Sequence, residues 1–150
     1  MQVKGQAAVR FSIVINEFFA DPAPSNGLPS SEFVELMNIT NKPIDLYGWR
    51  LADGNSFAII KQHFVLEPDS TVIICSSGAA DDYMLFGAAI GVSGFPSLDN
   101  ESDQIILYSD DQAIIHAISY NRKWYANSVK EEGGWTLEMI DAKNPCGAKN

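Results

Sequence analysis

The sequence predicts an all-β fold, an immunoglobulin-like antiparallel β-sandwich of about seven to nine strands with one short helix. Short stretches rich in β-branched and aromatic residues follow one another, with turn signals roughly every 8–12 residues. Long segments of helical periodicity do not alternate with them, which argues against a parallel α/β sheet. A chain of 150 residues with 46% hydrophobic and 19% charged residues has the length and composition of one globular domain.

The first two strands flank a long loop. Residues 13–19 are rich in β-branched and aromatic side chains and predict a strand. Residues 21–31 hold prolines, serines and a glycine, so they predict a surface excursion and not a tight hairpin. Residues 33–38 alternate in polarity, so Val34 and Leu36 are expected to face the core.

A third strand is expected over residues 46–51, after a turn formed by residues 41–43. Gly48 lies inside this stretch and suits a β-bulge. The bulge would let three apolar side chains reach the core, namely Leu46, Trp49 and Leu51. Five phenylalanines are also expected in the core: Phe18, Phe19, Phe33, Phe57 and Phe64.

The remainder of the chain continues the β pattern. Residues 71–75 are almost continuously apolar, as expected of a central strand. The one helix is expected over residues 79–86, where early carboxylates suit the helix dipole. Residues 87–96 are rich in glycine and predict a loop. Further strands are expected over residues 57–60, 64–66, 104–108, 113–120 and 135–140.

Several segments together carry a family resemblance. These are INE, FVELMN and DLYGWRLAD in the first part of the chain, and SLDNESDQIILYSDDQAIIHAISY and GGWTLEMIDAKNPCG in the last part. Over residues 13–141 the chain resembles the lamin tail domain family. The resemblance implies an immunoglobulin-like sandwich that acts as an interaction module, with no catalytic residues to carry over. It also implies a bacterial member, of the kind found beside nuclease, phosphatase or adhesion domains.

The domain boundaries follow from composition. Residues 1–11 are expected to be a leader, a linker or vector-derived residues, and residues 12–142 the sandwich. Residues 143–150 form a turn-rich tail that suggests truncation from a longer multidomain chain. The N-terminus lacks a full signal peptide, and no apolar run reaches the roughly 20 residues of a membrane helix. These features leave either an intracellular protein or a domain cut from a longer chain. The family resemblance favours the second, with a secreted, periplasmic or cell-surface location as part of a longer protein.

The charge balance limits the partners. Nineteen acidic residues against ten basic ones give a formal net charge of -9. Nucleic-acid binding needs clustered basic residues to neutralise phosphates, and the bases here are scattered. We expect no nucleic-acid partner and no membrane insertion. The acidity itself is typical of a solvated surface.

Two cysteines leave two alternatives open. Cys75 ends an apolar strand, and Cys146 follows a proline in the polar tail. In an oxidising compartment they could form a disulfide that closes a loop of 71 positions (146 − 75). Loop entropy would give such a bridge about 4 kcal/mol at best. The alternative is two free thiols, one of them a small buried hydrophobe.

Motifs for catalysis are missing from the sequence. It has two histidines, and no Gly-x-Ser-x-Gly elbow, phosphate-binding loop or dinucleotide fingerprint. Two cysteines and two separate histidines do not offer the close spacing of a zinc site. We predict no enzyme, no catalytic residue and no cofactor.

The carboxylates are the remaining candidates for metal chemistry. Asp99, Glu101 and Asp103 alternate along one segment, where their oxygens could hold Ca²⁺. The segment lacks the glycine and closing glutamate of an EF-hand, so a plain turn is the favoured interpretation. A second acidic group lies at the ends of the first loop and comprises Glu17, Asp21, Glu32 and Glu35.

One segment stands out as a candidate contact surface. It combines aromatic and basic side chains in a polar loop: Arg122, Lys123, Trp124 and Tyr125. Such groups are enriched at protein interfaces. The alternative is that the aromatics fold over the end of the sandwich. Phe95, in the glycine-rich loop, is a second candidate.

Three functional hypotheses follow. The leading one is a non-catalytic accessory module that binds a protein or glycan partner through loops. The second is a calcium-dependent or enzymatic domain that uses the acidic clusters, which then have to converge around one point. The third is a structural spacer whose exposed strand edges pair with neighbours.

Overall fold

A computed structural model describes residues 8–125, 129–139 and 143 of the chain. The described strands are β1 (Ile13–Phe19), β2 (Phe33–Asn38), β3 (Ile44–Asp45), β4 (Arg50–Ala52), β5 (Phe57–Ile59), β6 (Val65–Leu66), β7 (Thr71–Ser76), β8 (Ala89–Val92), β9 (Ser102–Tyr108), β10 (Ile114–Asn121) and β11 (Leu137–Glu138). The helical segments are η1 (Ser77–Ala79), α1 (Ala80–Tyr83), η2 (Arg122–Tyr125) and η3 (Lys130–Glu132).

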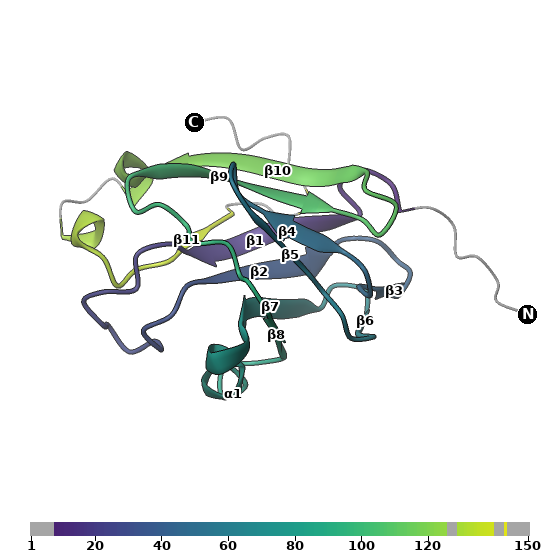
Figure 1. Ribbon diagram of the computed structural model, residues 1–150, viewed down its shortest axis with the longest axis horizontal. Helices are drawn as coiled ribbons and strands as arrows, with labels where there is room; N and C mark the ends of the chain where they lie inside the picture. Colours follow the sequence, from purple (N-terminus) through teal and green to yellow (C-terminus); the bar gives the residue numbers. More distant parts are fainter. Residues whose placement is uncertain (1–7, 126–128, 140–142, 144–150) are drawn as a thin grey trace, which may run out of the picture.

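The strands form two main sheets and one small ladder. The five-stranded sheet has the order β11-β1-β2-β7-β8, and the four-stranded sheet has the order β10-β9-β4-β5. Strands β3 and β6 pair with each other. In Figure 1, β9 and β10 lie in one layer above β1 and β2 of the other. This arrangement confirms the predicted immunoglobulin-like β-sandwich.

The main core fills the space between the two sheets. Alternation along β2 turns Val34 and Leu36 inward, and both are fully buried, as predicted. Trp49 is the bulkiest buried side chain and joins this core. The fold is therefore held by apolar burial between layers, at roughly 1.5–3 kcal/mol for each large aliphatic or aromatic side chain.

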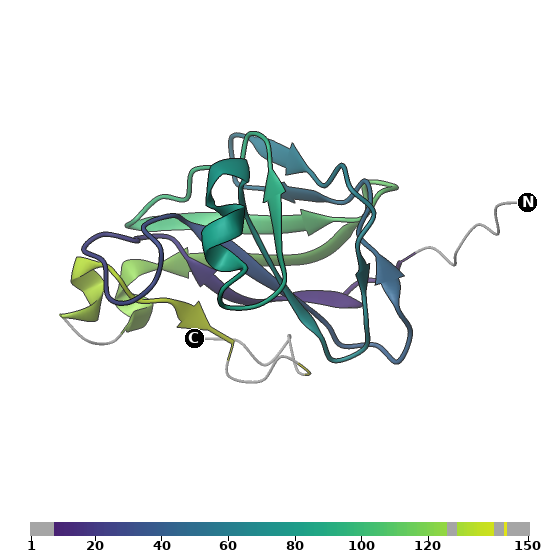
Figure 2. The same cartoon turned by 90° about the horizontal axis from the view of Figure 1, so that it is seen from below.

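A second, smaller core lies on the other face of the five-stranded sheet. Phe19, Phe33 and Cys75 project there and are covered by Tyr83 of α1. The Tyr83 hydroxyl donates to the carbonyls of Pro29, at 3.2 Å, and Ser31. Figure 2 shows α1 beside β8 on this side of the molecule. The short helix thus closes the sheet and fixes the end of the first loop.

The predicted third strand is wrong in its extent. Residues 46–49 form a turn between β3 and β4, and Gly48 has a φ of +81°. The amide of Trp49 donates to Leu46 at 3.1 Å, which closes the turn, so Gly48 makes a turn and not a bulge. The expected burial of Leu46, Trp49 and Leu51 is confirmed, because the turn folds their side chains back into the core.

The predicted loop at residues 87–96 is also wrong, because it contains β8. This strand pairs with β7 in parallel, and η1 and α1 make the crossover between them. The helix is shorter than the predicted 79–86, since α1 ends at Tyr83. Every other strand pair described is antiparallel.

The aromatic core prediction holds for some residues and fails for one. Phe18, Phe19 and Phe33 are buried, and Phe64 packs against the core while partly exposed. Phe57 is 53% exposed, because β5 turns Ala58 inward in its place. A strand buries alternate residues, so a one-residue difference in phase exposes the phenylalanine.

The two sheets are joined at one edge by the N-terminal residues. The amide of Phe11 donates to the carbonyl of Ile115 at 2.7 Å, and His116 Nδ1 accepts the amide of Ile15 at 2.8 Å. Phe11 belongs to the segment expected to be a leader, and its main chain contacts the sandwich. No described helix is long and apolar enough to cross a membrane.

Candidate interaction surface

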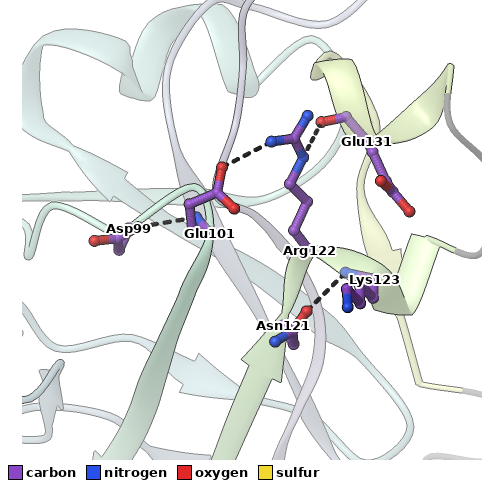
Figure 3. Close-up of polar contacts among 6 residues, drawn as sticks. All are labelled: Asp99, Glu101, Asn121, Arg122, Lys123 and Glu131. Carbon is purple, nitrogen blue, oxygen red and sulfur yellow. Dashed lines mark hydrogen bonds and ion pairs between the residues drawn. The ribbon is translucent and has the colours of Figure 1, made fainter.

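The predicted aromatic-basic segment forms η2, directly after β10. The Asn121 side chain accepts the amide of Lys123 at 2.9 Å and so begins the turn. The amide of Arg122 donates to the carbonyl of Glu101 at 2.7 Å. These bonds fix η2 against the start of β9. Figure 3 shows the bond between Asn121 and Lys123.

Arg122 of η2 contacts two other segments, the turn before β9 and η3. Its Nη1 lies 2.7 Å from Glu101 Oε1, and its Nε donates to the carbonyl of Glu131 at 2.8 Å (Figure 3). The hydrogen bond to Glu101 raises the pKa of the guanidinium. The cation is therefore occupied by intramolecular contacts and holds η3 beside η2.

Two other members of the segment differ in exposure. Trp124 is 45% exposed and Lys123 is also on the surface. Tyr125 is half-buried, and its hydroxyl donates to the carbonyl of Trp135 at 3.0 Å. Burial raises the pKa of Tyr125 to about 12. Tyr125 is thus held against the main chain at Trp135, while Lys123 and Trp124 face solvent, and the role of the segment as a contact surface stays a prediction.

The structure adds two residues that the sequence analysis missed. Trp135 is 37% exposed, and Lys130 Nζ lies 4.7 Å from the centre of its ring. Both follow η2 closely in sequence, so a second tryptophan near the same turn was the available signal. We define the end surface as Lys123, Trp124, Lys130 and Trp135, of which Lys130 is partly buried and the other three are exposed.

A shallow hollow of about 360 Å³ adjoins the end surface. Its lining mixes both charges with polar groups: Glu101, Ser102, Asn121, Arg122, Lys123 and Glu131. Two of its four charged residues, Arg122 and Glu101, form an ion pair. Such a rim suits polar contacts around an aromatic anchor.

The proposed calcium ligands each have another role in the structure. Asp99 Oδ1 accepts the amide of Glu101 at 2.9 Å, and Asp103 accepts the amides of Asp99 and Gln104. These bonds build a turn, as the favoured interpretation predicts. Within the described residues, no group of three or more His, Cys, Asp or Glu side chains could hold a metal ion. Calcium binding stays a prediction.

The second acidic group is spread over separate contacts. Glu17 accepts the Thr136 hydroxyl at 2.5 Å, and Glu35 accepts the Asn16 amide group at 2.8 Å. Glu32 accepts the amide of Leu98 at 3.1 Å, and burial raises its pKa to about 7. Burial also raises the pKa of Glu35.

The first loop is tied to the C-terminal segment through the main chain near Asp21. The carbonyl of Asp21 accepts the amide of Gly134 at 2.7 Å. Burial raises the pKa of the Asp21 carboxyl, and the nearby Arg122 opposes this shift. This member of the second acidic group therefore lies at the junction between the first loop and the end surface.

Phe95 and Cys75, also singled out from the sequence, are less accessible than the end surface. Phe95 is partly buried against the main core. Cys75 is fully buried, with its Sγ 3.8 Å from the Ile90 carbonyl, and burial raises its thiol pKa to about 11. Cys146 lies outside the described residues, so the disulfide stays a prediction.

Both histidines are engaged in local contacts. His116 is buried, and its Nδ1 is used by the Ile15 amide. His63 Nδ1 lies 2.6 Å from Asp45 Oδ2, and its ring stacks on Tyr47 with centroids 4.3 Å apart. These contacts order the β3–β6 region and the sheet edge.

The fold and the end surface describe an immunoglobulin-like domain that carries aromatic and basic residues at one end. The model of the Lamin Tail Domain family matches residues 6–122, well over half of the chain. The chain therefore belongs to the lamin tail domain family, as the resemblance predicted. Among curated proteins no match was found. The matched region ends at Arg122, so most of the end surface follows it.

Proposed function

We propose that this chain is a non-catalytic interaction module of a larger bacterial secreted or cell-surface protein, and that it binds a protein or glycan partner. The observation that carries the proposal is the end surface. Two partly exposed tryptophans, Trp124 and Trp135, accompany two lysines there. The family supports the proposal, because it is an immunoglobulin-like, non-enzymatic type of domain.

The geometry of the end surface favours binding. Tryptophan contributes strongly to interfaces because it buries a large rigid area with few rotatable bonds. The Arg122–Glu101 contact and the Tyr125–Trp135 hydrogen bond hold the surrounding turns in place. A surface that is ordered before binding loses less conformational entropy on association.

The test is affinity capture followed by measured binding. The full chain would be presented to extracts of the producing cell and to a glycan array, and each captured partner would be titrated. We expect Trp124→Ala to weaken binding by at least about tenfold. Val65→Ala, a change of a 52% exposed apolar residue in β6, is the control and should bind normally. Equal binding by both variants would exclude the end surface.

The location in a larger exported protein has its own test. The full reading frame around the segment should encode an export signal and a neighbouring domain. Export would also favour a bridge between Cys75 and Cys146. Mass spectrometry of the natural protein, with and without reductant, should then differ by two hydrogens. A frame without export signal or neighbouring domain would contradict this part of the proposal.

A calcium-dependent role is the alternative, and it has a direct test. Asp99, Glu101 and Asp103 lie near one turn, although Asp99 and Asp103 accept main-chain amides and Glu101 accepts the Arg122 guanidinium. Titration calorimetry with millimolar Ca²⁺ decides the matter. Absence of a heat signal would remove the metal-dependent hypothesis.

A second candidate function is assembly through a strand edge. In the described chain, β8 is the last strand of its sheet, and Met84, Leu85 and Phe86 beside it are all more than half exposed. Exposed apolar residues next to a sheet edge favour pairing with another chain. Analytical ultracentrifugation should then show concentration-dependent association that Leu85→Glu abolishes. A monomer at all concentrations would exclude assembly.

A further inference from the structure

Two neighbouring rows of mostly apolar residues cross the outer face of the four-stranded sheet. Strand register places Phe57, Ala52, Ile106 and Ala117 in one row across it. The next row holds Ile59, Arg50, Tyr108 and Ile114. Their sequence neighbours Leu51, Ala58 and Leu107 are buried in the core, so both rows face outward.

A hollow of about 350 Å³ opens on this face. Aromatic, basic and amide side chains line it, among them Arg50, Phe57, Tyr108, Asn55, Ser56 and Gln112. The hollow combines flat apolar surface with hydrogen-bonding groups at its rim. This hollow and the hollow beside η2 have no lining residue in common.

Arg50 is the charged centre of the hollow. Its Cζ lies 5.0 Å from the centre of the Phe57 ring. Within the described chain, no carboxylate forms an ion pair with it at 4.0 Å or less, in contrast to Arg122. Asp53 lines the same hollow, but its Oδ1 already accepts the amides of Asn55 and Ser56.

The contact with Arg50 explains why Phe57 is partly exposed. The Phe57 ring is about half exposed, and the Arg50 guanidinium lies over it. A guanidinium held flat on a ring keeps its N–H edge available for two parallel hydrogen bonds to a carboxylate. In a chain with a net charge of -9, an arginine without an ion pair among the described residues is the feature of this hollow that suits an anionic ligand.

We propose that this hollow binds a carboxylate-bearing saccharide, such as a uronic acid unit of an acidic polysaccharide. Arg50 binds the carboxylate, and the ring of Tyr108 offers an apolar face to the C–H face of the sugar. Asn55, Ser56 and Gln112 supply donors and acceptors for sugar hydroxyls. A shallow hollow on a sheet surface suits one unit of a longer chain, whereas small apolar ligands are usually enclosed.

The test uses a galacturonic acid trimer and its methyl ester, which is the same saccharide without charge. Titration would be followed by amide chemical shifts and calorimetry on the full chain. We expect the acid to bind, with shifts centred on β4, β5 and β9, and the ester to bind at least about tenfold more weakly. Arg50→Gln should reduce binding of the acid by a similar factor.

Two further variants separate chemistry from bulk charge. Lys61→Gln removes the same unit of charge from an exposed position outside the hollow, and it should bind normally. Arg50→Lys keeps the charge but loses the planar fork, so we expect intermediate binding. Amide spectra of each variant check the fold. Trp124 does not line this hollow, so loss of the end-surface partner in Trp124→Ala tests the proposed function separately from this inference.

Four results would overturn the proposal. The first is no binding of the acid at millimolar concentration, and the second is equal binding of acid and ester. The third is tighter binding of a tripeptide with a free C-terminal carboxylate, which would assign the hollow to peptide ends. Equal loss of binding in Arg50→Gln and Lys61→Gln would likewise reduce the effect to net charge.

Discussion

His116 shows how one side chain can complete a strand edge. Its Nδ1 takes the amide of Ile15 at the place where β1 has a register shift, between Ile15 and Glu17. The amide would otherwise be a buried donor without a partner. A main-chain hydrogen bond is thus replaced by a side-chain one, and the neutral imidazole is required for it.

The role of His116 predicts acid sensitivity. Burial lowers its pKa from 6.5 to about 4, so the folded state binds fewer protons than the unfolded state between these values. Stability should therefore fall as the pH drops below 6.5, by roughly 2 kcal/mol at pH 5. His116→Asn retains an acceptor and should flatten this pH dependence in urea unfolding experiments. An unchanged slope in the variant would contradict the assignment.

The raised pKa of Glu32 predicts the opposite pH dependence of stability. Burial raises its pKa from 4.5 to about 7, so its contribution is fully present below pH 4.5 and is lost as the pH rises through 7. Glu32→Gln keeps an acceptor for the Leu98 amide and removes the charge. We expect a gain at pH 8 on the order of 1 kcal/mol, after allowance for solvent screening, and none at pH 4. Thermal melts at both pH values measure it.

At the scale of elements, the sequence predicted β1 and β2 with their bounds as found, and it missed β8. Local alternation was sufficient for the antiparallel strands because each carries its own pattern of buried and exposed residues. Strand β8 is short, contains a glycine, and pairs with β7 in parallel. Its pairing depends on the crossover through η1 and α1, which local pattern does not reveal.

Close packing between η1 and β8 predicts a sensitive glycine. A Cβ atom at Gly91 would lie 2.8 Å from the Ser77 Cα, which is main chain and cannot simply rotate away. We expect Gly91→Ala to destabilise the fold by about 1–3 kcal/mol through overpacking. Gly78→Ala is the matched control, because a Cβ there meets nothing within 4 Å. Denaturant unfolding of both variants tests the contrast, and equal stability would refute it.

One of the two candidate sites could be predicted from the sequence, and the other could not. The aromatic-basic segment at Trp124 was visible in the sequence because it interrupts a polar loop. The hollow around Arg50 was not, since its members come from β4, β5, β9 and two turns. Phe57 was expected in the core because phenylalanine in a strand usually is. Only strand register shows that it faces outward beside Arg50.

For the whole molecule, the family match ends at residue 122, but the folded unit continues. Strand β11 pairs with β1 at Glu17 and Phe18, and Gly134 bonds to Asp21. A chain cut at residue 122 would lose these contacts. We expect it to melt at a lower temperature than the full chain and to elute from size-exclusion columns as larger species. Identical melting of both chains would contradict this.

The small β11 strand therefore decides where a recombinant fragment should stop. A boundary drawn from family similarity alone would leave the β1 edge unprotected, and such an edge recruits neighbouring molecules. A fragment extended through residue 139 keeps the edge covered by its own chain. Strand β11 thus protects the edge of β1, and we expect fragments that lack β11 to aggregate more readily than fragments that retain it.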